Sequence, residues 1–521
     1  MNADRRHYLP GAPAAVVAVL TLAFAWACAR FVAQPSIAGF ADDSVSYLIM
    51  GQVFSPWRPA SGAVAAAFAS EAFYPPLFPL LLGWAGAAHD VLRAHVLVAL
   101  LVAAGLPLAY GLGVRWLEDR RAAEAATLCI AALPALWINA LGILSEPLFG
   151  VLMLSTLLVL DREAPVTPGR IALVAALMAA MALTRTAALP VIAVYGLWAL
   201  SRRGRAWDAR LRLAVPAVAA VVAYAAWVLL RPAETTDSYA RILADHAWGG
   251  VVAGVVRQAH AVAEGWIGSL IIYWIEGRPT RAALAGLAGG AALAGLVLRL
   301  RAGKADGWMT AAYLGVFLAW PFSDQMGRFL FPILPVLVLY AFQAVRRGLE
   351  ALGRPPLLGA GVMALFFLSL TLPALAFLHQ RAQSPSPHAG IVDWYRTAGL
   401  DAARARAQVH LDLFADLEEV RRRTTPSDRV MWVTPAYVAL LADRIGVKAP
   451  DDRLAKEEYR KAVAASGATH VLLTLYNPRD TTRHDAWEAG TKALLDGAQP
   501  LHLRVREGST VVSSVLLKVE R

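Results

Sequence analysis

The sequence predicts a polytopic α-helical membrane protein that ends in a soluble, external α/β domain. Hydrophobic residues make up 58% of the 521 positions and charged residues only 17%, whereas a soluble domain carries about a quarter charged residues. The charges are also uneven: residues 1–378 hold 48 of them and the much shorter segment 379–521 holds 39. This composition excludes a cytosolic globular protein, a disordered chain and a disulfide scaffold.

Residues 1–378 contain about eleven apolar runs that are long enough, or nearly so, to span a bilayer. The first run could instead be a signal peptide, because Arg5 and Arg6 precede it and small residues surround Cys28. We favour an uncleaved helix, since the uncharged run from Leu9 to Ala29 is long enough to span. The runs centre near residues 12–32, 92–114, 122–141, 146–160, 170–184, 187–200, 213–230, 282–298, 308–322, 329–345 and 357–378.

The distribution of charge predicts the orientation. With the N-terminus in the cytoplasm, the cytoplasmic segments hold 18 basic and 9 acidic residues, and the external segments of the same region hold 10 and 11. This is the positive-inside bias, so the net charge of +11 is a topology signal and calls for no nucleic-acid partner. Cys28 and Cys129 both fall in predicted membrane helices, which argues against a structural disulfide.

The first external loop, residues 34–91, carries an acidic motif. Asp42 or Asp43 can cap a short helix running to about Phe54, on which Asp43 and Tyr47 share a face. We expect this helix to lie on the membrane surface and to hold a carboxylate at the boundary between water and lipid. The alternative is that both aspartates only cap the helix and form a solvated turn. The apolar stripe that favours surface placement consists of Val45, Leu48, Ile49 and Val53.

Two further features sit at predicted helix starts on the external side. Tyr74 is followed by Pro75 and Pro76, which predict an extended approach to a helix. Glu146 follows Ser145 at the external end of the fourth apolar run, and an ionisable residue at that depth is a functional candidate. The alternative for Ser145 and Glu146 is a helix cap and first turn, where a carboxylate is favoured.

Arg185 and Arg328 lie at external helix ends, against the topology bias. Arginine has the side chain best shaped to grip phosphate oxygens. The alternative is that these side chains reach out to lipid headgroups.

Taken together, these motifs resemble those of the GT-C superfamily of integral-membrane glycosyltransferases. The resemblance is to the bacterial branch related to aminoarabinose transferases and protein O-mannosyltransferases. The matching motifs are the acidic segment 43–48, the Tyr-Pro-Pro-Leu segment 74–77, the Ser-Glu pair 145–146 and the Arg-Phe-Leu-x-Pro-x-x-Pro segment 328–335.

The resemblance implies an enzyme of the bacterial inner membrane that moves a sugar from a polyprenyl phosphate to an envelope lipid, glycan or protein acceptor, with inversion, on the external face. Asp43 matches the catalytic acidic residue, and the choice of base between Asp43 and Asp42 stays open. That carboxylate would deprotonate the acceptor, and we expect its neighbouring charge and partial burial to raise its pKa. Some members use a divalent metal, Mg²⁺ or Mn²⁺, which the resemblance leaves open here.

Other residues receive roles from the same resemblance. Positive charge for the leaving phosphate would come from Arg328, Arg185 and Arg58, and Tyr74 stands where relatives often have His or Lys. Glu146 and Tyr47 would form an acceptor or second acidic site.

The uneven charge density divides the chain into a membrane module, 1–378, and an α/β domain, 379–521, entered through a linker at 380–387, and the topology bias places this domain outside. Strands are expected at 429–433 and 469–475, helices near 435–444, 452–466 and 484–496, and a hairpin near 501–506 and 510–519. Two other functions remain as alternatives: a transporter or flippase of a lipid-linked saccharide, and a non-catalytic scaffold for envelope assembly.

Overall fold

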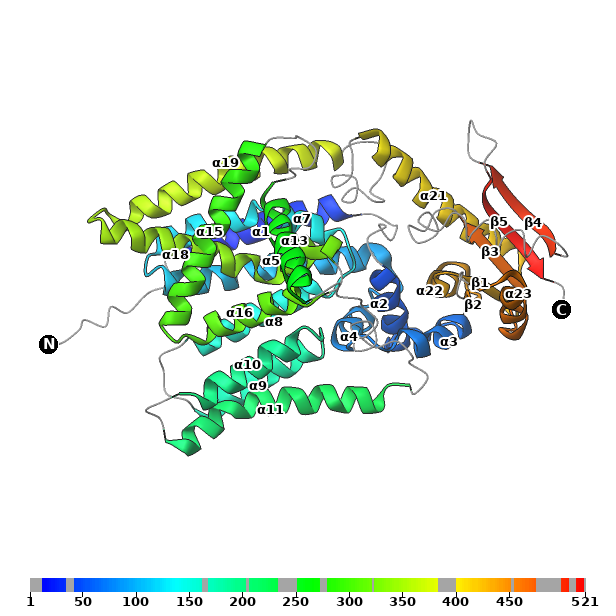
Figure 1. Cartoon of the computed structure of the whole chain (residues 1–521), viewed down its shortest axis with the longest axis horizontal. Coiled ribbons are helices and arrows are strands. Elements are labelled where there is room, and N and C mark those ends of the chain that lie inside the picture. Colours follow the sequence, from blue (N-terminus) through cyan, green and yellow to red (C-terminus); the bar gives the residue numbers. More distant parts are fainter. Residues whose placement is uncertain are drawn as a thin grey trace.

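The computed structural model describes residues 12–33, 42–161, 167–202, 206–232, 251–271, 279–320, 323–382, 400–450, 454–474, 498–505 and 512–519. Long helices run side by side through most of the molecule, and a small sheet lies beyond one end of them (Figure 1). The helices of the first part are α1 (Ala12–Val32), α2 (Asp42–Val53), α3 (Gly62–Glu71), α4 (Leu77–Trp84), α5 (Val91–Trp116), α6 (Arg120–Ala131), α7 (Pro134–Ala140), α8 (Glu146–Leu160), α9 (Pro168–Ala182), α10 (Ala188–Leu200), α11 (Trp207–Leu230), α13 (Val251–Leu270), α15 (Pro279–Arg301), α16 (Ala305–Leu318), α17 (Met326–Leu330), α18 (Leu334–Ala351) and α19 (Pro356–Ala382).

Several of these helices are long and apolar enough to cross a membrane, which makes the chain a multi-pass membrane protein. Among the described residues there are six such spans, or seven if α6 and α7, bent by 49°, are counted as one. Three shorter apolar helices, α8, α9 and α10, lie beside them. The expected count of eleven spans is not confirmed and stays a prediction. Between the seventh and eighth predicted runs the structure contains a further helix, α13.

The ends of the helices follow from local chemistry. The side chain of Asp90 accepts a hydrogen bond from the backbone N–H of Arg93 at 3.1 Å and so caps α5. Asp119 caps α6 in the same way through Ala122, at 2.9 Å. Pro134 lacks an N–H, so the chain breaks between α6 and α7.

Helices α15 and α18 approach each other closely at Gly295. A Cβ atom on this residue would lie 2.1 Å from the backbone oxygen of Tyr340, far inside contact distance. The absence of a side chain therefore allows the two backbones to meet.

We expect Gly295→Ala to destabilise the protein by about 1–3 kcal/mol, because the added methyl group must push the two helices apart. Gly290→Ala is the matched control on the same helix, since a Cβ atom there meets nothing within 4 Å. Thermal unfolding in detergent measures both. A midpoint for Gly295→Ala equal to that of Gly290→Ala would contradict this packing.

The three short helices α2, α3 and α4 gather at one end of the long helices, between them and the sheet (Figure 1). The placement of α2 at the membrane surface stays a prediction, but its apolar stripe packs against protein. Its apolar residues Val45, Leu48 and Ile49 are at most 1% exposed and belong to a core cluster that also contains Val438 and Leu516 of the C-terminal part. The stripe packs against protein side chains, so α2 and the C-terminal part share one hydrophobic core.

The C-terminal part is an α/β unit. It contains α21 (Leu400–Arg423), β1 (Arg429–Trp432), α22 (Pro435–Tyr437), the π-helical turn η3 (Val438–Ala442), β2 (Ile445–Lys448), α23 (Lys456–Ala465), β3 (His470–Thr474), β4 (Ala498–Val505) and β5 (Val512–Val519). The sheet order is β2-β1-β3-β5-β4. Strand β1 is parallel to β2 and β3, and β5 is antiparallel to β3 and β4.

The predicted strands and hairpin of this unit are confirmed. Helix α21 and strand β2 were not predicted. In β2 the reason is the short sequence Ile-Gly-Val-Lys, in which only two apolar residues alternate. The predicted helix near 484–496 lies outside the described residues, as does the predicted linker beyond Ala382, where α19 ends.

Candidate functional site

Four segments that are far apart in the sequence bring charged side chains together at the end of the helices where α2 lies. Asp43 belongs to the first turn of α2, and Glu146 is the first residue of α8. Arg185 lies in the turn between α9 and α10, and Arg328 lies in α17. The result is a cluster of two carboxylates and two guanidinium groups, called here the charged cluster.

Arg328 is the centre of the charged cluster. Its Nη2 binds Oδ2 of Asp43, and its Nε binds Oε1 of Glu146. Its Nη1 donates to Oε1 of Gln325 at 3.1 Å. Only 9% of the Arg328 side chain is exposed, so this guanidinium holds both carboxylates inside the protein and does not reach out to lipid headgroups.

The chain places Arg328 by interrupting its own helix. Pro332 and Pro335 cannot donate backbone hydrogen bonds, and the segment divides into α17, a 3₁₀ turn at Phe331–Ile333 and α18. The break is local, because Met326–Ala351 still runs as a single span. Gly150 of α8 packs against Pro332, with a Cβ position 3.4 Å from the Pro332 Cα atom, so the Arg328 segment is fixed against the helix that begins with Glu146.

Arg185 completes the charged cluster from the opposite side of Glu146. Its Nη1 lies 2.8 Å from Oε1 of Glu146 and donates to Oγ of Ser145 at 3.0 Å. The Ser145 hydroxyl is also 2.9 Å from the Tyr47 hydroxyl. Ser145 therefore occupies the cap position of α8, but its side chain joins Arg185 to Tyr47 and makes no cap hydrogen bond.

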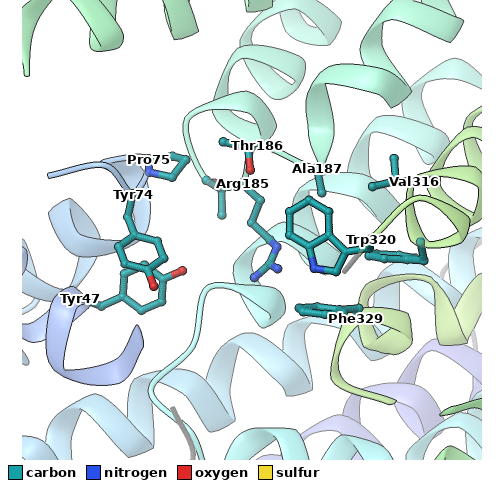
Figure 2. A pocket seen from close by; sticks show the side chains of 11 residues that line it. Tyr47, Tyr74, Pro75, Arg185, Thr186, Ala187, Val316, Trp320 and Phe329 are labelled. Carbon is teal, nitrogen blue, oxygen red and sulfur yellow. The ribbon is translucent and has the colours of Figure 1, made fainter. Parts of the chain in front are cut away.

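A pocket opens beside the charged cluster (Figure 2). Tyr47 and Tyr74 line one side, Trp320 and Phe329 line the other, and the Arg185 guanidinium points into the space between them. The pocket encloses about 360 Å³, including space open to solvent. The side formed by Trp320 and Phe329 was not predicted. Trp320 stands at the end of a predicted membrane helix, where aromatic residues gather.

The electrostatics of Asp43 differ from expectation. Burial alone would raise the pKa of its carboxyl, but Arg328 and the Tyr74 hydroxyl, which donates to Oδ1 at 2.6 Å, hold that pKa below its ordinary value. The prediction of a raised pKa is therefore wrong in this arrangement, because an opposite charge in direct contact outweighs desolvation.

One carboxylate oxygen of Glu146, Oε2, takes no part in the hydrogen bonds of the charged cluster. The residue is fully buried, and among the described residues its Oε2 has no hydrogen-bond partner. A buried oxygen of this kind is an exception that calls for an explanation, and a bound ligand is one.

One predicted site residue, Arg58, is not joined to the charged cluster. Arg58 is exposed after α2, where its backbone oxygen contacts His89. Asp42 is the first residue of α2, and its side chain lies outside the described residues. Because the helix begins at Asp42, Asp43 lies within the first turn and does not cap it.

The charged cluster does not fit a divalent metal in this arrangement. Within the described part of the chain, no group of three or more His, Cys, Asp or Glu side chains is placed to hold one. Between Asp43 and Glu146, the position that a cation would take is filled by the Arg328 guanidinium.

Comparison with known proteins places this fold. No family model matches the sequence, and no curated protein matches it either. Among solved structures, ArnT from Cupriavidus metallidurans in the apo state has a TM-score of 0.56 at 14% identity, over 97% of this chain and 98% of that one. ArnT bound to undecaprenyl phosphate gives 0.54 at 15%, over 96% and 97%. The oligosaccharyltransferase of Archaeoglobus fulgidus, tethered to an acceptor peptide, gives 0.53 at 13%, over 96% and 74%.

The fold is thus that of GT-C membrane glycosyltransferases, as the sequence motifs indicated. The similarity to ArnT extends over nearly the whole of both chains and includes the C-terminal part.

Proposed function

We propose that this protein transfers a sugar from a polyprenyl-phosphate donor to a hydroxyl group of an envelope lipid, glycan or protein. The observation that carries the proposal is the charged cluster, in which Arg328 binds Asp43 and Glu146 at the edge of a partly aromatic pocket. The undecaprenyl phosphate bound by ArnT, a protein of the same fold, supports a donor of this chemical class.

The proposed reaction is a single displacement at the anomeric carbon. The acceptor oxygen forms the new bond, the bond to the phosphate oxygen breaks, and configuration inverts. Asp43 takes the acceptor proton as general base. The polyprenyl phosphate leaves with its charge compensated by Arg185, which lines the pocket, and by Arg328, which shares Glu146 with it.

This mechanism requires Arg328 to change partners. In the structure both oxygens of Asp43 are occupied, by Arg328 and by Tyr74, and a carboxylate held this way is a weak base. A donor phosphate offers Arg328 a competing anion, and its arrival would release Oδ2 of Asp43. Glu146 keeps Arg185 as its partner during this exchange.

The pH dependence of transfer follows from this exchange. For free enzyme, the Asp43 pKa lies below the ordinary 3.8, so the carboxylate is ionised and kcat/KM stays flat as pH falls from about 7 to about 5. In the substrate complex, loss of Arg328 raises that pKa, so the acid limb of kcat lies at higher pH than that of kcat/KM. Rate profiles measured with saturating and limiting donor check this, and coincident acid limbs would contradict it.

Orientation is also part of the proposal, with the charged cluster and the α/β unit outside the cell. Both cysteines are buried, so single cysteines can be introduced as reporters. We expect a membrane-impermeant maleimide to label Ser427→Cys in intact spheroplasts, and to label Arg354→Cys only after permeabilisation. Both positions are exposed, and the reverse pattern would invert the topology.

The experiment that tests the function uses purified protein in proteoliposomes. Supplied with an undecaprenyl-phosphate sugar and envelope extract, it should release undecaprenyl phosphate and form a glycosylated product. A nucleotide sugar alone should give no product. Movement of intact donor across the bilayer without bond cleavage would support the flippase alternative, and neither activity would support the scaffold.

A further inference from the structure

A second pocket lies at the other end of the helices that build the candidate site. Helices α9, α10 and α16 each have one end near the first pocket and the other end near the second. Glu146 begins α8 in the charged cluster, and Asp161, just after its end, lines the second pocket. The 15 residues of α8 therefore separate the charged cluster from the second pocket by about 22 Å. The second pocket encloses about 1100 Å³, including space open to solvent.

Basic side chains line this second pocket and are held in place by backbone oxygens. Arg170 donates from Nε and Nη2 to the oxygen of Val159, at 3.1 and 2.8 Å. Arg202 donates from Nη1 to the oxygen of Gly303 at 3.2 Å and stacks over Trp198, 5.2 Å from the ring centre. Lys304 is exposed at the rim.

The two acidic side chains of the second pocket, Asp161 and Asp306, are paired with Arg299, which is not among the residues that line the pocket. Arg299 binds Asp306 through two hydrogen bonds of 2.7 Å and binds Asp161 at 3.1 Å. Asp306 also accepts a hydrogen bond from the Tyr340 hydroxyl at 2.8 Å. Arg170, Arg202 and Lys304 therefore give the space a surplus of positive charge, which favours an anion.

The second pocket also has an apolar side that is continuous with the outer surface. Leu157, Val174 and Leu213 line it. On the neighbouring surface of α9 and α11, Leu173, Leu211 and Val215 are 49%, 48% and 47% exposed. In a multi-pass membrane protein such a surface contacts acyl chains. A ligand that uses both sides has an anionic head and a hydrocarbon tail.

We propose that the second pocket binds the phosphate headgroup of an anionic phospholipid of the surrounding bilayer. Basic pockets between membrane helices are sites of this kind. The apolar side and its continuity with the exposed surface favour a lipid over a free phosphate ion. This site is distinct from the charged cluster, and the proposal does not depend on the proposed function.

The test measures binding of phosphatidylglycerol in mixed lauryl maltoside micelles to the full chain, by the shift of its thermal unfolding. The variant Arg202→Ala/Lys304→Ala removes two lining charges. The matched control, Arg212→Ala/Arg301→Ala, removes two exposed charges outside the pocket lining. We expect about 30-fold weaker binding in the first variant and little change in the second, since each basic group near an anionic lipid contributes about fivefold.

Further arms decide between ligands. Phosphatidylcholine should give no comparable shift. Inorganic phosphate is tested on the wild-type protein in the same way. If phosphate alone shifted the thermal unfolding as much as phosphatidylglycerol does, the ligand would be a small anion and the lipid assignment would be overturned. Equal weakening in both double variants would overturn the site itself, because the effect would then come from general surface charge. Lys304→Ala alone changes a residue at the exposed rim and should weaken binding about fivefold. This single variant replaces the double variant in the test if the double variant does not fold.

Discussion

Asp43→Asn is expected to lower the transfer rate by about 10²–10⁴-fold, the range that a positioned general base contributes. The amide has the size of the carboxylate and can still accept a hydrogen bond from Arg328, but it cannot take a proton from the acceptor. The donor should still bind, because Arg328 and Arg185 remain. Single-turnover transfer measures the loss, and retention of a labelled donor analogue measures binding.

The matched control for this change is Asp42→Asn, on the neighbouring residue of α2. Asp43 contacts Arg328 and Tyr74 and is the base that we propose, so we expect Asp42→Asn to keep most of the activity. The reverse outcome would assign the base to Asp42, and full activity in the double variant would exclude a carboxylate base from α2.

Arg328→Ala is expected to have the largest combined effect, on both activity and stability. It leaves the partly buried Asp43 with the Tyr74 hydroxyl as its remaining partner among the described residues, and it removes one of the two guanidinium groups from the fully buried Glu146. Removing one partner from a buried ion pair costs about 3–5 kcal/mol. The matched control is Arg93→Ala, which breaks an exposed pair with Asp90 and should cost about 1 kcal/mol or less.

Arg328→Lys separates the two effects. A lysine keeps the charge but cannot bind two carboxylates through a rigid planar group. The unfolding midpoint of Arg328→Lys should therefore lie between those of Arg328→Ala and the wild type, while its transfer rate stays at least about tenfold below wild type. Chemical unfolding and donor-dependent transfer, measured on the same preparations, check this. A lysine variant with full activity would show that charge alone is sufficient and that the bridging geometry is dispensable.

Much of the fold could be predicted from the sequence because apolar runs and helix signals are local. The expected boundaries of the fourth run, 146–160, are those of α8, and the strand at 469–475 is β3 within one residue. Local patterns failed where burial decides. The stripe Val45, Leu48 and Ile49 has the same periodicity whether it covers lipid or protein, and only the neighbouring C-terminal core shows that it covers protein.

The candidate residues Asp43, Glu146, Arg185 and Arg328 could be singled out because an ionisable group at the edge of a predicted membrane helix is a functional candidate. Their arrangement could not be predicted. Asp43 and Arg328 are 285 positions apart, and a guanidinium that pairs with two carboxylates depends on how four segments pack. For the same reason the direction of the Asp43 pKa was predicted wrongly, since it depends on a partner that only the folded chain brings into contact.

By itself, the sequence determined that this chain enters a membrane and ends in an α/β unit, because hydropathy and strand alternation act over short distances. Tertiary structure alone decided that α2 is inside the protein, that one arginine joins both carboxylates, and that a basic pocket lies at the far end of the same helices. These are long-range contacts, and their energies depend on distance and burial, which no local pattern of residues contains.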